Sequence, residues 1–179
     1  MPRTQFLTAA LIPFTLLGLV GCSTAGAEVT SPRESYDVSR VRGYDTLEEL
    51  AEASDLIVVA EVTDQYDITE IHGLPFTRRT VVPTETLKGD APDPLIIRVI
   101  GTPDDEGALA PGTTHLLYLT EFSFEPGEPT NEYAVVGVYA GDYLQTETEV
   151  FEKTDDESPE LPVEVSQDEA VATLPETKE

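Results

Sequence analysis

The sequence is poor in the residues that usually carry catalysis, metal binding or cross-linking. It has one cysteine, two histidines and no tryptophan in 179 residues. A single cysteine excludes a disulfide within the chain, so the folded part must depend on its own apolar core. One thiol and two separate histidines do not supply the usual nitrogen and sulfur ligands of a zinc site. We therefore predict no metal and no cofactor.

Basic residues are also scarce. The chain has ten Lys and Arg against 35 Asp and Glu, for a formal net charge of −25. Proteins that bind nucleic acid neutralise its phosphates with Lys and Arg, so we predict no nucleic-acid partner. The same charge repels anionic lipid headgroups. It is compatible with cationic partners, divalent cations or a salty environment, and it does not choose among them.

No apolar run is long enough to cross a bilayer comfortably. The longest run, residues 6–20, contains Pro13 and falls short of the roughly 20 apolar residues that a membrane-spanning helix needs. It follows Arg3, and a positive start before a short apolar run is typical of a secretory signal peptide. We predict that residues 1–21 are a signal peptide.

The four residues Leu19-Val20-Gly21-Cys22 resemble the lipobox of bacterial lipoproteins. This resemblance implies that acyl chains such as palmitate are attached through the Cys22 thiol. It also implies that a signal peptidase recognises Leu19, Val20 and Gly21 and cuts before Cys22. We therefore expect a mature protein that is lipid-anchored on the extracytoplasmic face of the cell membrane. The alternative is that Cys22 is an ordinary free or buried cysteine.

Both ends of the mature chain have the composition of disordered segments. Residues 22–43 are small, polar and charged without apolar periodicity, which predicts a flexible tether. Residues 152–179 are rich in acidic residues and contain three prolines, which predicts an acidic disordered tail. The alternative for residues 161–165 is a short extended segment at a sheet edge.

Residues 44–151 have the pattern of a folded β domain. A capped amphipathic helix is predicted at residues 45–54, followed by the β-branched run 56–62, which indicates a strand buried on both faces. Pro83 indicates an edge or a bulge. Further strands are predicted at residues 76–87, 95–101, 115–120, 133–139 and 143–151. Because no helix separates these strands, we predict antiparallel pairing.

Three segments of this domain also carry a family resemblance. The sequences at residues 53–62, 85–89 and 112–119 resemble those of bacterial envelope proteins whose barrel is similar to the netrin and tissue-inhibitor-of-metalloproteinase modules. The resemblance implies a mainly β, OB-like antiparallel barrel of about five or six strands with one short N-terminal helix, flanked by disordered tails. The animal inhibitors bind zinc through a disulfide-held N-terminal cysteine, and this chain lacks that framework, so their activity is not implied.

The sequence contains no recognisable catalytic motif. A Gly-x-Ser-x-Gly nucleophile motif is absent, and His72 and His115 are interpreted as structural or solvated. We therefore predict that the protein is not an enzyme. Acidic clusters at residues 64–70, 104–106 and 155–157 do not match the EF-hand spacing. We interpret them as solvated loops, with weak calcium binding as the alternative.

Phe122 and Phe124 are the best candidates for a binding site, because they lie where a strand gives way to a loop. An exposed ring at that point would form a binding rim. Arg78-Arg79 and Arg98 are interpreted as neutralising neighbouring carboxylates, with an anion-attracting spot as the alternative. The predicted function is a non-catalytic binding module whose partner is another envelope protein. The alternatives are an envelope enzyme or enzyme inhibitor, or an acidic structural surface protein.

Overall fold

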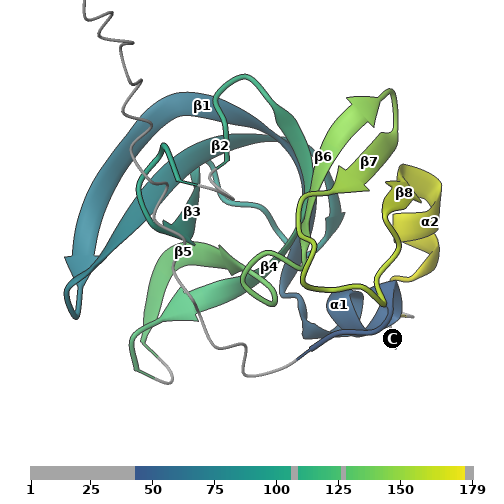
Figure 1. Ribbon diagram of the computed structural model, residues 1–179, viewed down its shortest axis with the longest axis horizontal. Coiled ribbons are helices and arrows are strands. Elements are labelled where there is room, and N and C mark those ends of the chain that lie inside the picture. The colour runs from purple at the N-terminus through teal and green to yellow at the C-terminus, as the bar shows by residue number, and fades with distance from the viewer. Residues whose placement is uncertain (1–42, 106–108, 126–127, 176–179) are drawn as a thin grey trace, which may run out of the picture. The chain divides into compact units, whose positions relative to one another are not determined.

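The computed structural model describes residues 43–105, 109–125 and 128–175 (Figure 1). The predicted signal peptide, Cys22 and nearly all of the predicted tether lie outside the described residues. The described elements are α1 (Leu47–Ala53), β1 (Leu56–Ile71), β2 (Leu74–Lys88), β3 (Leu95–Ile100), β4 (Thr114–Ser123), β5 (Pro129–Val135), β6 (Asp142–Glu147), β7 (Val150–Lys153), β8 (Glu164–Ser166) and α2 (Gln167–Ala172).

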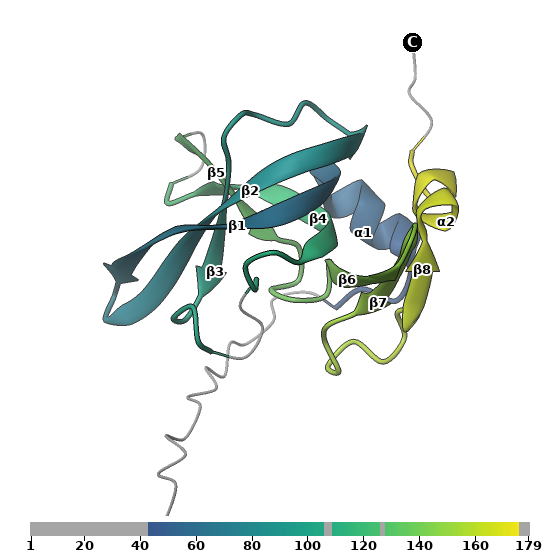
Figure 2. The same cartoon turned by 90° about the horizontal axis from the view of Figure 1, so that it is seen from above.

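The eight described strands form one sheet that is partly rolled into a ring. Their order is β1-β2-β3-β5-β4-β6-β7-β8, and β1 also pairs with β4, so five strands follow one another around the ring. Figures 1 and 2 show β1 and β2 as a long curved hairpin on one side and β6 to β8 on the other. The predicted mainly β class is confirmed, but the sheet is larger than a simple barrel of five or six strands.

One pairing corrects the prediction of purely antiparallel strands. β3 and β5 pair in parallel through Ile97 with Tyr133 and Arg98 with Ala134. The prediction assumed that only a helix can return the chain to the same direction. Here β4 lies between β3 and β5 in the sequence, and a strand that runs back provides the same reversal.

Helix α1 forms where its capping residues predict it. The Thr46 side chain accepts a hydrogen bond from the Glu49 amide, and Glu48 and Glu49 lie at the positive end of the helix dipole. Its buried face consists of Leu47, Leu50 and Ala51. None of the helices in the described part of the chain is long and apolar enough to cross a membrane.

Residues 56–60 of β1 and 115–119 of β4 are buried on both faces and separate two apolar cores. Ile57 and Val59 of β1 pack with Leu116 and Tyr118 of β4 beside α1. The alternate residues of both strands face the interior of the ring. These inner residues are Leu56, Val58, Ala60, Val62, Leu117 and Leu119. Burial on both faces explains the continuous apolar run at the start of β1.

The prediction of a disordered tail from residue 152 is wrong for the described residues. β8 pairs with β7, and α2 begins with a capping box between Ser166 and Glu169. Leu161, Val165 and Ala170 are 2%, 1% and 0% exposed and belong to the same core as α1. The apolar residues that dock this segment are few and widely spaced. Because acidic residues surround them, the composition of the segment indicated disorder although it is folded.

Two further predicted strands have different limits. The segment predicted as one strand at residues 143–151 is the hairpin of β6 and β7, with Glu149 in the left-handed region near its turn. The strand predicted at residues 133–139 ends at Val135, and Gly137 and Val138 follow with φ of 68° and 70°. Such φ values cannot continue a strand.

Candidate functional site

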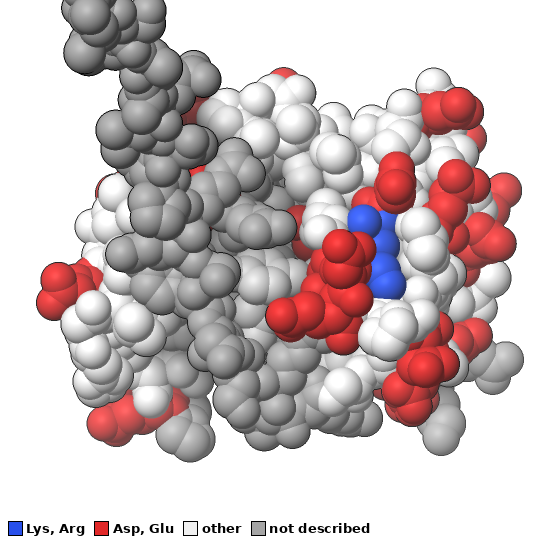
Figure 3. Space-filling model, in the orientation of Figure 1, with Lys and Arg blue, Asp and Glu red and all other residues white. Residues whose placement is uncertain are grey.

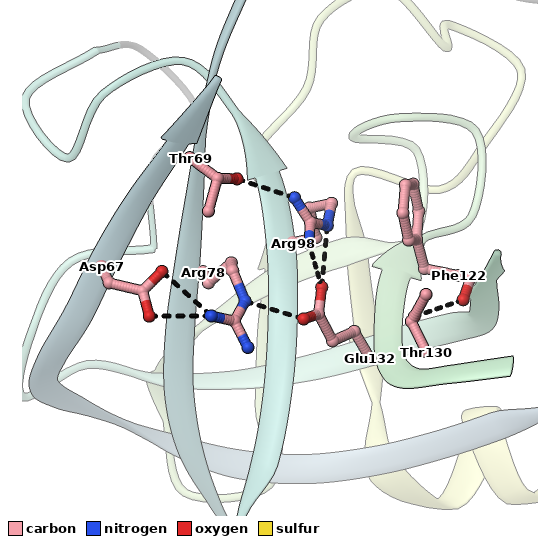
Figure 4. Close-up of polar contacts among 7 residues, drawn as sticks. All are labelled: Asp67, Thr69, Arg78, Arg98, Phe122, Thr130 and Glu132. Atoms are coloured by element: carbon pink, nitrogen blue, oxygen red, sulfur yellow. Dashed lines mark hydrogen bonds and ion pairs between the residues drawn. The ribbon is translucent and has the colours of Figure 1, made fainter. Parts of the chain in front are cut away.

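The ring gathers four charged side chains and one aromatic ring on the outer face of its strands. We call Asp67, Arg78, Arg98, Phe122 and Glu132 the outer-face cluster. Strand pairing brings them together, because Asp67 lies opposite Arg78, Arg78 opposite Arg98, and Phe122 opposite Glu132. Five different strands therefore contribute one residue each (Figure 4).

Glu132 is the centre of the cluster and joins two arginines. Its Oε1 accepts from Arg78 Nε at 2.7 Å, and its Oε2 accepts from Arg98 Nε at 2.8 Å (Figure 4). Arg98 Nη2 lies 2.5 Å from the same Oε2. The side chains of Arg98 and Glu132 are 6% and 8% exposed, so this ion pair is buried. Asp67 accepts from Arg78 Nη1 on the exposed side.

The two carboxylates and two guanidinium groups balance one another. Partial burial tends to lower the pKa of Arg78, but the charges of Glu132 and Asp67 outweigh it, and the pKa of Arg78 is raised. Arg98 Nη1 additionally donates to Thr69 Oγ1 at 2.9 Å. The prediction that these arginines neutralise neighbouring carboxylates is confirmed for Arg78 and Arg98. It is wrong for Arg79, whose Nε and Nη1 are buried without a hydrogen-bond partner.

Phe122 and Phe124 lie directly against this network. Their rings meet edge to face, with centroids 5.0 Å apart. The Arg98 Cζ lies 4.7 Å from the Phe122 ring centre and 5.5 Å from that of Phe124. Phe124 is 61% exposed, whereas Phe122 is partly buried. One ring of the predicted pair is therefore presented to solvent, and its use as a binding rim stays a prediction.

A small cavity opens beside Phe122 and Arg98. Its volume is about 140 Å³, close to that of engineered apolar cavities of about 150 Å³ that bind benzene. The remaining lining residues are Phe76, Val99, Ile100, Leu109, Ala134, Val135, Val138, Tyr139 and Asp142. Val138 has a φ of 70°, a conformation that strains a β-branched residue. The lining is mainly apolar, so the cavity suits an apolar group.

No protein-family model and no curated protein matches this chain.

His115 has partners that resemble a catalytic triad in outline. Its Nδ1 lies 2.6 Å from Asp142 Oδ1, and its Nε2 lies 2.8 Å from Thr113 Oγ1. The Thr113 hydroxyl, however, donates its proton to the Ala110 carbonyl at 2.6 Å. A nucleophilic hydroxyl must give that proton to the histidine. The arrangement therefore fits a buried structural bridge between β4 and β6, which also includes a hydrogen bond from Thr154 to Asp142.

The acidic clusters do not assemble a cation site among the described residues. Within residues 43–105, 109–125 and 128–175, no group of three or more His, Cys, Asp or Glu is arranged to hold a metal ion. Asp67 pairs with Arg78, and Asp105 accepts from the Thr102 amide and hydroxyl. Glu106 lies outside the described residues. Figure 3 shows acidic side chains spread over one face, with basic side chains in one small patch.

Sequence reasoning missed Glu132, which organises the cluster. It is one acid among 35, and no local pattern marks it. Its neighbour Asn131 has a φ of 58°, a conformation that asparagine tolerates better than most residues. His72 lies in the β1–β2 turn with a φ of 52°.

Proposed function

We propose that this protein is a lipid-anchored, extracytoplasmic binding module that captures a protein partner on the outer face of an OB-like barrel. The observation that carries the proposal is the cavity beside Phe122, with the 61% exposed Phe124 ring next to it. An exposed aromatic ring beside an apolar cavity is the arrangement found at the energetic centres of protein interfaces.

The topology supports this choice of surface. The ring order β1-β2-β3-β5-β4 with return to β1 is consistent with an OB-like barrel. OB-folds bind their ligands on the face of the second and third strands and with the loops between strands one and two and strands four and five. Arg78 and Arg98 lie on β2 and β3, and Phe124 lies in the β4–β5 loop. The resemblance to netrin-like envelope domains points the same way.

The ion-pair network prepares the site for binding. Arg98 is held by Glu132 and Thr69, and both phenylalanine rings pack against its guanidinium group. A ring that is already in position loses little conformational freedom when a partner binds, which increases affinity. The balanced charge of the cluster gives no strong preference for an anion or a cation. The favoured ligand is therefore an apolar or aromatic side chain of a partner protein.

Capture of a partner from an envelope extract tests the binding surface. The bait is the chain from residue 22 with Cys22→Ser, compared with Phe124→Ala and Ala134→Leu versions of it. Phe124→Ala removes the exposed ring, and Ala134→Leu fills part of the cavity that Ala134 lines. Val163→Ala is the matched control, because Val163 is 65% exposed and does not line the cavity.

We expect the first two variants to lose the captured partner by at least about tenfold, which corresponds to about 1.4 kcal/mol, while Val163→Ala retains it. Equal capture by all four proteins would refute the proposed surface. Circular dichroism of each variant separates lost binding from lost folding.

The membrane anchor has its own test. Cys22→Ala should abolish labelling by a palmitate analogue and move the protein from the membrane fraction to the soluble fraction. Gly21→Leu should slow cleavage before residue 22 and leave a larger precursor on a gel. An unchanged membrane fraction in Cys22→Ala cells would show that the anchor is not the lipid on this residue.

A further inference from the structure

Arg79 differs from every other basic residue in the described part of the chain. Arg78 and Arg98 pair with carboxylates. Lys88 donates to the carbonyls of Ala51 and Ser54, and Lys153 donates to those of Ser158 and Leu161. Arg79 is 1% exposed, yet its Nε and Nη1 have no hydrogen-bond partner.

Strand pairing explains why Arg79 is buried. Neighbouring residues of a strand point to opposite faces, so Arg79 faces away from the outer-face cluster that holds Arg78. Its pairing partners are Tyr66 on β1 and Ile97 on β3. The Arg79 Cζ lies 4.9 Å from the centre of the Tyr66 ring. Tyr66 therefore covers one face of the guanidinium group, while the N–H donors lie in its plane.

A buried guanidinium group without an acceptor is costly. Arginine keeps its charge at neutral pH, and a buried charge is normally paired or hydrogen-bonded. Burial lowers the pKa of Arg79, although the nearby Tyr66 phenol opposes this effect. The chain contains 35 acidic residues, and none in the described region reaches this group. Although acidic side chains are abundant in the sequence, Arg79 Nε and Nη1 have no acceptor.

We propose that Arg79 is the anchor of a binding site for a small monocarboxylate that has an apolar body. A carboxylate matches the planar donors of one guanidinium group and cancels its single charge. A phosphate dianion would leave one negative charge buried and unpaired. The Tyr66 ring lies over the face of the guanidinium group, so a carboxylate would approach in the plane of the N–H donors. Because Nε and Nη1 are buried, the side chains around them must move to admit it.

The neighbouring residues indicate the apolar body. Tyr66 is 52% exposed and Ile68 is 51% exposed. Ile68 lies opposite Thr77, on the same face of the β1–β2 hairpin as Tyr66 and Arg79. A short aliphatic or aromatic acid can place its carboxylate at Arg79 and cover these two side chains. This site lies on the opposite face of β2 from the proposed protein-binding surface, so either proposal can fail without the other.

Thermal unfolding of the purified protein in different sodium salts tests the site. Butyrate, acetate, phosphate and chloride are compared at constant pH and ionic strength. At ten times its Kd, butyrate should raise the Tm by roughly 3–6 °C relative to chloride, since ligand binding stabilises the folded state. Acetate should raise the Tm less because it has a smaller apolar body, and phosphate should behave like chloride.

Arg79→Met should abolish the effect of butyrate, and it should still fold because it replaces an unpaired buried charge with an apolar chain of similar length. Lys178→Met is the matched control, since it changes the net charge equally, and it should retain the full shift. Equal butyrate shifts in the wild type and Arg79→Met, or a larger shift with phosphate, would overturn the proposal. If Arg79→Met does not fold, the wild-type protein is titrated with butyrate and the Arg79 Nε–Hε resonance is followed by nitrogen-15 NMR. The chemical shift of this resonance should change, and an unchanged shift would overturn the proposal.

Discussion

Replacing Glu132 by alanine should be among the most destabilising single changes on the outer face of the ring. The substitution removes the only carboxylate that contacts Arg98 and one of the two that contact Arg78 among the described residues. Arg98 is 7% exposed and would be left as a buried charge with Thr69 as its remaining hydrogen-bond partner and no carboxylate among the described residues. Loss of one partner from a buried ion pair typically costs about 3–5 kcal/mol.

The change in net charge should by itself stabilise the Glu132→Ala variant slightly, so it opposes the expected loss of stability. Glu132→Ala lowers the magnitude of a net charge of −25 and so reduces self-repulsion. A measured loss of stability therefore reports the local pairing. Urea unfolding followed by tyrosine fluorescence gives the free energy of unfolding, and the absence of tryptophan leaves the tyrosine signal unobscured.

Asp67→Ala is the matched control for Glu132→Ala. Asp67 also binds Arg78, but its side chain is 59% exposed, and exposed ion pairs contribute about 0–1 kcal/mol. The Asp67 contribution should also weaken in high salt, whereas the Glu132 contribution should change little. Equal losses for the two variants, or a loss below about 1 kcal/mol for Glu132→Ala, would refute the view that Glu132 organises the cluster.

Three further predictions concern stability, each measured by denaturant unfolding. Leu161→Ala should cost about 2–5 kcal/mol because Leu161 is buried, while the exposed Val163→Ala should be nearly neutral; equal effects would mean that this segment does not dock. Gly89→Ala should cost at least about 1 kcal/mol more than Gly112→Ala. Both glycines have a φ near 80°, but only at Gly89 would the new Cβ lie 2.5 Å from a main-chain oxygen. Burial raises the pKa of Tyr118 to about 12, against about 10 in an unfolded chain, so the contribution of Tyr118 to stability should fall by about 2 kcal/mol between pH 10 and 12. Tyr118→Phe should reduce this loss of stability at high pH. An unchanged pH dependence in the variant would contradict the role of Tyr118.

The parts of the fold that were predictable are those with a strong local signal. Thr46 and the acidic residues after it mark the start of α1, and the β-branched run from Leu56 marks β1. Pro83 predicted an irregularity, and the β1–β2 register shifts between Val59 and Ala60, which lies opposite Pro83. In each case the residue type itself restricts the backbone, so no tertiary information is needed.

The parts that were not predictable depend on contacts between distant residues. Arg78 and Arg79 are identical in the sequence, and only strand pairing places one against Glu132 and the other beneath Tyr66. The parallel pairing of β3 with β5 likewise follows from the path of the whole chain. The candidate site was found only in part, because Phe122 and Phe124 stand at a recognisable strand end, whereas Glu132 acts through partners 34 and 54 residues away.

The C-terminal segment also determines which edge of the sheet the protein exposes. β8 is the last strand in the sheet order, and it is only three residues long and includes Glu164. Short, charged edge strands resist edge-to-edge association between molecules. Without β8, the edge would be β7, whose Phe151 belongs to the core. A chain cut before Glu164 should therefore aggregate. The acidic C-terminal segment protects the edge of the sheet from pairing with other molecules.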